Sequence, residues 1–454
     1  MKKLIITSAL SLILFLIHAQ TNPVITKWLQ NTTGIMGRHY VSGNSTPITD
    51  ADSANVQTVL YSASSVYIRT NGIPAYISGP FLGGNPTIAT NQNAIFKFPL
   101  NPVQNTGTPS STTGGNIGVF INGVALFDFR DNVSWQNSSS SLKGGPLGGN
   151  GDMVWNRDAV IGERLGFDCS KAHPANGNYH HHQNPSAFNL DLKVISTICN
   201  LYAADGLYAI DSTKHSPLIG FAYDGFPIYG AYANKNVNGT GGIVRMKSSY
   251  VLRNITTRTT YSNGTTVTGG PDVSSTYQLG YFREDYQYNA TSSSTPDYLD
   301  EHNGRFCVTP EYPNVIYCYF ATVDSNWNSA YPYVVGPTFY GTKTASKVPS
   351  ITESVSIYPK PASTAVKNVF FKNASFSIYP NPTSDIVTVQ LNDLAKENIK
   401  IELFTISGKL INTSTLFQGS TILYFDTRTY YSGDYFIRIY NGDEIITKKI
   451  TLIK

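Results

Sequence analysis

The sequence is poor in charge and lacks several common catalytic motifs. Charged residues make up 14% of the 454 residues, and 33 basic against 29 acidic side chains give a formal net charge of +4. A balance so close to neutral excludes the strongly basic surface that nucleic-acid binding requires. There is no Gly-x-Ser-x-Gly, His-Glu-x-x-His, phosphate-loop or EF-hand pattern, and no two cysteines have a Cys-x-x-Cys spacing. Serine hydrolases, zincins and nucleotide-dependent enzymes are therefore disfavoured.

Long apolar runs are also missing, except at the N-terminus. Lys2 and Lys3 precede an apolar run over residues 4–17, which ends at the small residue Ala19 before a polar stretch. This pattern is typical of a secretory signal peptide, expected over residues 1–19. No later run approaches the length of a membrane-spanning helix, so we expect no transmembrane segment in the mature chain. The sequence thus predicts an exported protein.

Methionine is scarce and tyrosine abundant, with four of the former and 30 of the latter, amid many glycines and asparagines. Aromatic and β-branched runs broken by glycine favour strands and turns over helices. The segment 190–204, LDLKVISTICNLYAA, is the best helical candidate. We therefore expect a mainly β body over residues 22–341 with a few short helices.

The four cysteines are Cys169, Cys199, Cys307 and Cys318. Disulfides persist in exported proteins, and four cysteines allow three connectivities. We favour Cys169–Cys199, and less strongly Cys307–Cys318, where Pro310 and a following asparagine indicate a turn between two strands. The alternative is that some of the four are buried thiols.

The C-terminal part has a different pattern from the body. Residues 342–374 carry three prolines among Ser, Thr and Lys, which is typical of a linker. Beyond the linker, six short segments alternate apolar and polar residues and are separated by turn pairs such as Ser407-Gly408. Such alternation predicts a small antiparallel β-sandwich over residues 375–454.

Four motifs in this region carry a resemblance. They are FSIYPNPTSD at 376–385, ISGK at 406–409, GDYFIR at 433–438 and the terminal KKITLIK at 448–454. Together they resemble the type A C-terminal sorting domain of the type IX secretion system. The resemblance implies recognition by that secretion machinery, transport through the periplasm and across the outer membrane, and either release or attachment at the cell surface.

The stretch CSKAHPANGNYHHHQNP, residues 169–185, contains four of the eight histidines. If residues 179–182 form a strand, His180 and His182 lie on one face and His181 on the other. The Asn176-Gly177 turn signal folds the chain back and brings His173 towards them. Imidazole is a ligand common to zinc and copper, so the sequence predicts a transition-metal site of His173, His180 and His182. The alternative is a polar surface loop.

The body also resembles the YHYH family of exported bacterial proteins over about residues 117–340. The resemblance rests on segments 116–127, 155–159, 167–174, 179–182, 215–230, 299–305 and 309–313. His181 stands where the family label has its second tyrosine, which agrees with an off-face position. The resemblance implies an exported domain with a histidine motif and brings no established activity.

Four further residues are candidates for the site. His215 is a fourth candidate ligand, although a lone histidine in an apolar segment is more often a core residue. Asp224 and Glu163 are candidate acid–base groups, but Asp224-Gly225 between aromatic runs is first of all a hairpin turn. His302 is a weaker candidate, at a turn.

Several charged side chains can also support such a site. Asp158, Glu163 and Asp168 are candidate acceptors that would orient an imidazole. Arg157 and Arg305 would pair with these acids or hold an anionic substrate, and ion pairing is the simpler interpretation in a body so poor in charge.

Two classes of function remain open. The first is an exported or cell-surface protein that binds copper or zinc through the histidine cluster and uses the metal in an oxidoreductase or hydrolase reaction of unknown substrate. The second is a non-enzymatic module for adhesion or glycan binding, in which the histidines are structural. Metal content separates the two.

Overall fold

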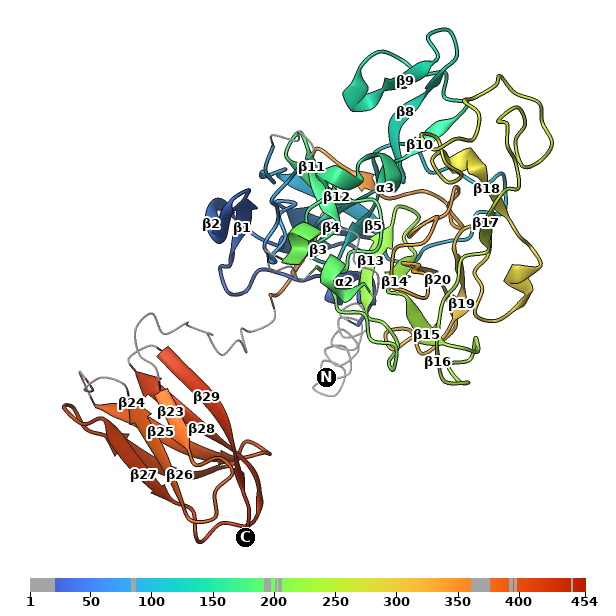
Figure 1. The fold of residues 1–454 in the computed structure, drawn as a ribbon. Helices are drawn as coiled ribbons and strands as arrows, with labels where there is room; N and C mark the ends of the chain where they lie inside the picture. The colour runs from blue at the N-terminus through green and yellow to red at the C-terminus, as the bar shows by residue number, and fades with distance from the viewer. Residues whose placement is uncertain are drawn as a thin grey trace, which may run out of the picture. The chain divides into compact units, whose positions relative to one another are not determined.

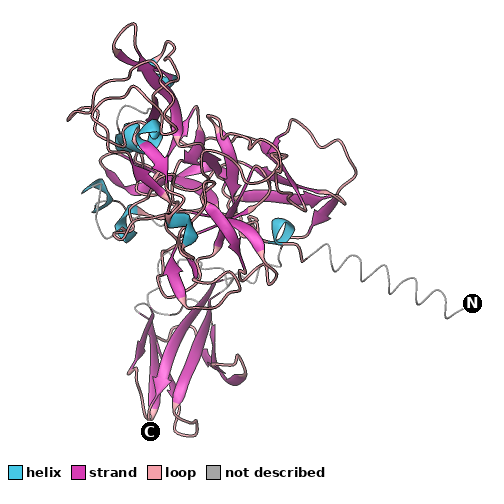
Figure 2. Ribbon diagram, turned by 90° about the vertical axis from the view of Figure 1, so that its right-hand side faces the viewer, coloured by secondary structure: helices cyan, strands magenta, loops and turns pink. Residues whose placement is uncertain are grey.

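The computed structural model describes residues 21–82, 87–191, 197–200, 202, 206–360, 376–391, 395, 398–441 and 444–454. The expected signal peptide lies outside the described residues. The chain divides into two compact units, Met1–Lys360 and Pro361–Lys454. Strands and loops dominate both units, and the helices are short, as Figure 2 shows. The prediction of a mainly β protein is confirmed.

A five-stranded antiparallel sheet lies in the first unit (Figure 1). Its order is β21 (Ser346–Lys347), β5 (Ala94–Pro99), β4 (Ser65–Thr70), β3 (Val56–Tyr61) and β22 (Ser356–Tyr358). Both edge strands come from the segment 342–374 that the composition assigns to a linker. The structure differs here because β21 and β22 are too short to show alternation and form by pairing with β5 and β3. Residues 361–375 of that segment lie outside the described residues.

An eight-stranded mixed sheet is the largest in the first unit. Its order is β11 (Ala172–Ala175), β12 (Asn178–His181), β7 (Ala125–Phe127), β6 (Asn116–Phe120), β13 (Leu218–Ala222), β14 (Pro227–Tyr229), β20 (Ile316–Phe320) and β19 (Gly304–Cys307). The pairs β12–β7 and β14–β20 are parallel. A buried core of aromatic and aliphatic side chains, including Phe98, Val119 and Phe221, packs between strands of the two sheets.

Smaller elements surround these sheets. The paired strands are β1 (Met36–Val41) with β2 (Asn44–Ser53), β8 (Arg130–Gln136) with β9 (Ser141–Gly144) and β10 (Asn156–Asp158), β15 (Tyr232–Asn234) with β16 (Ile243–Arg245), and β17 (Tyr250–Leu252) with β18 (Tyr286–Tyr288). The helical turns are α2 (Pro23–Thr26), α3 (Ala159–Gly162), η1 (Gly145–Leu147), η2 (Arg164–Gly166), η3 (Phe188–Leu190), η4 (Thr197–Asn200), η5 (Arg283–Asp285) and η6 (Ser292–Ser294).

The helical candidate 190–204 is only partly described. Its described residues include the end of η3 and the four residues of η4, which are 3₁₀ turns. Residues 192–196, 201 and 203–205 lie outside the described residues. Cys169 and Cys199 form a disulfide with a Cα–Cα distance of 5.4 Å, as the sequence predicts.

The second predicted disulfide does not form, and Cys307 and Cys318 are buried free thiols. The prediction of two strands joined by a turn is correct, because β19 pairs with β20. In that pairing Cys307 lies opposite Ile316 and Cys318 lies opposite Arg305, so the two cysteines are diagonal neighbours. Diagonal Cα atoms are about 7–8 Å apart, which is beyond the usual reach of a disulfide.

The second unit is a small antiparallel β-sandwich, as predicted. One sheet has the order β23 (Phe376–Tyr379), β24 (Ile386–Leu391) and β27 (Ile422–Asp426). The other has the order β26 (Leu410–Leu416), β25 (Ile399–Thr405), β28 (Gly433–Asn441) and β29 (Glu444–Leu452). The inward positions of the strands, among them Val389, Leu403 and Ile437, form a core of their own.

Candidate metal centre

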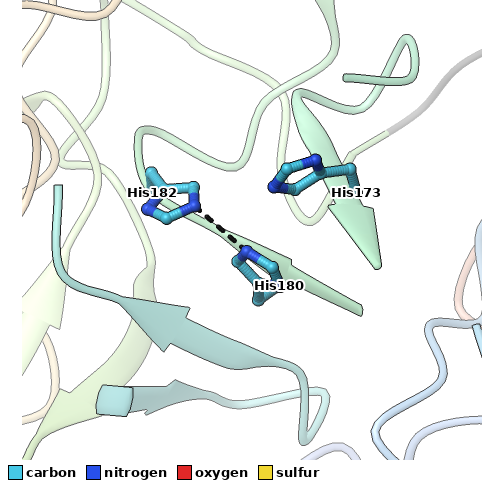
Figure 3. Close-up of side chains that lie close together, drawn as sticks. All are labelled: His173, His180 and His182. Carbon is cyan, nitrogen blue, oxygen red and sulfur yellow. Dashed lines mark hydrogen bonds between the residues drawn. The ribbon is translucent and has the colours of Figure 1, made fainter. Parts of the chain in front are cut away.

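Three histidines come together at the edge of the eight-stranded sheet (Figure 3). His173 lies on β11 directly opposite His180 on β12, and His182 follows two residues after His180. The turn between the strands is Asn176-Gly177, with φ angles of 49° and 79°, as a two-residue hairpin loop requires. One nitrogen from each imidazole lies within 4.8 Å of the other two. The predicted turn and the predicted shared face are both present.

Backbone carbonyls determine which ring nitrogens face the centre. Nδ1 of His180 lies 2.8 Å from the carbonyl oxygen of Asn178, and Nδ1 of His182 lies 2.5 Å from that of Asp128. A carbonyl oxygen only accepts, so both Nδ1 atoms carry the proton and donate it. In the neutral ring the Nε2 atom then presents a lone pair. The Nε2 atoms of His180 and His182 face each other at 3.0 Å.

A carboxylate completes the cluster. Glu163 directly follows helix α3, whose first turn is capped by the Asp158 side chain. Oε2 of Glu163 lies 3.1 Å from Nε2 of His173 and 3.2 Å from Nε2 of His182. Burial alone would raise the pKa of Glu163, but the two neighbouring imidazoles hold it well below its ordinary value. Glu163 is therefore an anion beside three imidazoles.

Two of the converging atoms lack a well-directed hydrogen bond. Nε2 of His173 and Oε2 of Glu163 are buried and, although close to each other, are not aligned as donor and acceptor. Buried polar atoms in native proteins normally have a partner, so an unpartnered pair needs an explanation. Burial, followed by the positive charge that His182 and His173 can carry, lowers the pKa of His180 well below its ordinary value. A shared cation is one explanation for the two unpartnered atoms.

Aromatic rings hold the imidazoles in place. Phe127 of β7 stacks on the ring of His180, with centroids 3.8 Å apart and an angle of 18° between the planes. Phe167 meets His173 edge to face at 4.9 Å. These contacts restrict rotation of the two rings about their side-chain bonds, so the lone pairs remain directed towards the centre.

The cluster forms part of the wall of a cavity of about 950 Å³. Glu163, Phe127 and the Asp131–Arg157 ion pair also line it. Two leucines at this cavity are unusually exposed, Leu147 by 50% and Leu165 by 80%. A small molecule with an apolar part therefore has room beside the three histidines.

His181 faces away from this cavity, as the strand alternation predicts. Its Nε2 lies 2.7 Å from the Tyr76 hydroxyl and its Nδ1 lies 3.2 Å from the carbonyl oxygen of Lys171. Burial lowers the pKa of His181 to about 3, so the ring is neutral. Both ring nitrogens of His181 therefore have protein partners.

The structure does not bring the other two candidates to the cluster. His215 donates Nδ1 to the carbonyl oxygen of Ser216 at 2.7 Å and meets the Tyr229 ring at 5.2 Å, and it does not line the cavity. Asp224 lies in the turn between β13 and β14, where it accepts hydrogen bonds from the Tyr319 hydroxyl and the Gly341 amide. The hairpin-turn interpretation of Asp224 therefore fits its position.

The remaining charged candidates have structural partners. Arg157 lines the cavity, paired with Asp131, whereas Arg305 donates to backbone carbonyls. Asp168 accepts from the Tyr179 hydroxyl and three backbone amides, including that of Gly79. His302 bonds to Thr338.

Sequence reasoning missed Phe127, Phe167 and the carbonyl of Asp128. Phe127 lies in a recognisable apolar run, but nothing in that run indicates that it stacks on a histidine 53 positions later. The role of a backbone carbonyl cannot be inferred from the residue type, because every residue has one. Glu163 was a candidate, and the structure places it against the cluster.

Two family models match the chain. Residues 95–332 match the model described as YHYH protein, and residues 377–454 match the model described as secretion system C-terminal sorting domain. Both resemblances inferred from the motifs are thus confirmed. No curated protein matches the sequence. Among the described residues, no helix has the length and apolar character needed to cross a membrane.

Proposed function

The chain belongs to the YHYH protein family and carries a sorting domain that directs it to secretion or to the cell surface, and we propose that its body binds one transition-metal ion, copper or zinc. His173, His180 and His182 are the proposed ligands. Glu163 is either a fourth ligand or a base beside the ion.

The facing lone pairs of His180 and His182 are the main support. Both Nδ1 atoms donate to carbonyls, so the two rings, when both are neutral, place lone pair against lone pair at 3.0 Å. Such a contact is repulsive unless a proton or a metal cation lies between the two nitrogens. Although burial opposes it, the carboxylate of Glu163 raises the pKa of His182 and favours a proton on its Nε2. A metal ion satisfies both of these nitrogens together with His173 and Glu163, whereas a single proton satisfies one pair of atoms.

The spacing of His180 and His182 also suits one ion. Metal–imidazole bonds of about 2.0–2.1 Å put two ligand nitrogens about 2.9–3.4 Å apart, for angles between a right angle and a tetrahedral one. The separation of 3.0 Å between the His180 and His182 nitrogens lies in that range. The backbone carbonyls of Asn178 and Asp128 act as the outer partners that orient metal-binding histidines.

The ligand set supports both copper and zinc. Imidazole and carboxylate without thiolate are common to both metals, and neither is excluded from an oxidising compartment. Bound zinc would supply a water of lowered pKa, and bound copper a redox centre. As an anion close to such a centre, Glu163 would accept a proton at Oε2 only transiently, and the cavity would give a substrate access. We therefore propose a metal-dependent oxidoreductase or hydrolase as the activity.

Metal analysis of the full chain tests the binding proposal. We expect the purified protein, loaded separately with zinc and with copper and then desalted, to retain one equivalent. The double variant His180→Ala/His182→Ala should retain none while keeping its circular dichroism spectrum. His215→Gln is the matched control and should retain the wild-type amount. Loss in the control equal to that in the double variant would contradict the three-histidine assignment.

A conservative variant tests the role of Glu163. Glu163→Gln keeps the size of the side chain and removes its charge, so we expect weaker metal binding by roughly tenfold or more. A folded wild-type protein that retains neither metal would overturn the proposal, and so would unchanged metal content in the double histidine variant.

A further inference from the structure

A second cavity, of about 690 Å³, shares a wall with the first. Val160, Ile161 and Arg164 line the second cavity, whereas Gly162 and Glu163 line the one at the histidines. Consecutive residues just after β12 are divided between the two cavities in the same way. His182 lines the metal cavity, and the next residue, Gln183, lines the second one.

Three polar residues that line the second cavity have buried atoms without a hydrogen-bond partner. Gln183 is only 1% exposed, and its Nε2 atom has no hydrogen-bond partner. Oδ1 of Asn328 and Oγ of Ser329 are also buried without a partner. The Asn328 amide nitrogen donates to Asp324, so its oxygen is oriented as a free acceptor. The three residues line the cavity, so a rotation of each side chain would present an amide donor, an amide acceptor and a hydroxyl to a ligand.

The charged side chains in the cavity are already engaged. Lys247 pairs with Asp297 at 2.7 Å, and Arg245 donates to the carbonyl oxygen of Val323 at 2.6 Å. Asp324 accepts from the Asn326 amide at 2.7 Å and from the Asn328 side chain. The groups that remain free are neutral, which favours an uncharged ligand rich in hydroxyl groups.

Aromatic side chains supply about half of the remaining lining residues. Five tyrosines line the cavity, and they are Tyr250, Tyr286, Tyr298, Tyr331 and Tyr333. Tyr286 and Tyr331 stack with centroids 3.9 Å apart, and Tyr250 meets Tyr331 edge to face at 5.4 Å. Rings packed against each other in this way lose little freedom when a ligand binds. Their apolar surfaces suit the C–H faces of a sugar ring.

We propose that this tyrosine-lined cavity binds a neutral carbohydrate. The hydroxyl groups of the sugar would accept from Gln183, donate to Asn328 and bond to Ser329, while its ring packs against the tyrosines. One or two sugar residues fit a cavity of this size. The proposal does not depend on metal binding, because neither Gln183 nor the tyrosines belong to the metal ligand set.

Calorimetric titration of the full chain tests the proposal. The probes are maltohexaose, cellohexaose, xylohexaose, mannohexaose and chitohexaose, and we expect at least one to bind with a dissociation constant in the millimolar range or tighter. Gln183→Leu keeps the size of the side chain and removes its donors, so it should weaken binding of that probe roughly fivefold to tenfold. Tyr298→Ala should weaken binding of that probe by at least as much.

Two controls test whether the loss of sugar binding is specific to this cavity. Tyr431→Ala changes a tyrosine that is 88% exposed in the second unit and should leave binding unchanged. The metal content of the same Gln183→Leu sample should also be unchanged. That result would show that the neighbouring His182 is undisturbed. Absence of binding by all five probes would overturn the proposal. Binding that resists both Gln183→Leu and Tyr298→Ala would place the sugar elsewhere and overturn it equally.

Discussion

The disulfide closes a loop that contains all three proposed ligands, and its removal gives a sharp prediction. Cys169 and Cys199 are 30 residues apart, and His173, His180 and His182 lie between them. Loop-closure entropy for a separation of 30 residues corresponds to a stabilisation of about 3.6 kcal/mol at room temperature. We expect the free energy of unfolding of the first unit to fall by about this amount in Cys169→Ala/Cys199→Ala.

Metal binding should respond differently from stability. The antiparallel pairing of β11 with β12 sets His173 opposite His180, and the Asp128 carbonyl orients His182. None of these contacts uses the disulfide, so the double cysteine variant should still bind one equivalent of metal at temperatures where it is folded.

Denaturant unfolding followed by tryptophan fluorescence measures the effect. All four tryptophans lie in the first unit, so the signal reports on that unit alone. Reduction of the wild-type protein should reproduce the loss, because Cys307 and Cys318 are already free thiols. A loss below about 1 kcal/mol in both experiments would refute the loop-entropy argument. Loss of metal from the folded variant would show that the cross-link, rather than the hairpin, aligns the ligands.

Three further predictions concern buried polar groups. His181→Leu should retain metal but lower the free energy of unfolding by about 2–4 kcal/mol, since it leaves two buried polar partners unpaired; denaturation and metal analysis of one sample check both. Lys171→Met should lower the free energy of unfolding by about 3–5 kcal/mol, because it leaves the buried carboxylate of Asp191 without its partner at 2.7 Å. Adding Asp191→Asn should recover part of this loss in the same denaturation assay. Burial raises the pKa of Asp158 to about 7, so the folded state binds more protons than the unfolded state between about pH 4 and pH 7. The stability that this group contributes is therefore present at low pH and falls as the pH rises through that window. Asp158→Asn should flatten the dependence of the free energy of unfolding on pH over the same window.

The sequence predicts those features of the site that depend on local geometry. Side chains alternate along any strand, so His180 and His182 had to share a face once a strand was assumed. An Asn-Gly pair favours a two-residue hairpin loop, and a hairpin places His173 opposite His180. These inferences need only neighbouring residues, and they are the ones that the structure reproduces.

Features that depend on pairing between distant segments could not be predicted. The diagonal register of Cys307 and Cys318 depends on where β19 meets β20, and residue types do not fix that register. Strands β21 and β22 exist because β5 and β3 offer unpaired edges, not because their own sequences show alternation. His215, like His180, donates its Nδ1 proton to a backbone carbonyl, but it is not part of the histidine cluster found among the described residues.

His181 gives an internal comparison for the metal proposal. It is as deeply buried as its neighbours on β12, and each of its ring nitrogens bonds to a protein group, Tyr76 on one side and Lys171 on the other. That is the pattern of a histidine with a structural role. His180 and His182 have only their Nδ1 atoms satisfied in this way, by carbonyls of a β-hairpin and of a neighbouring loop that cannot turn away without breaking backbone pairing. Their Nε2 atoms face each other and lie close to the carboxylate of Glu163 and the ring of His173, and the proposed cation would satisfy all of these groups together.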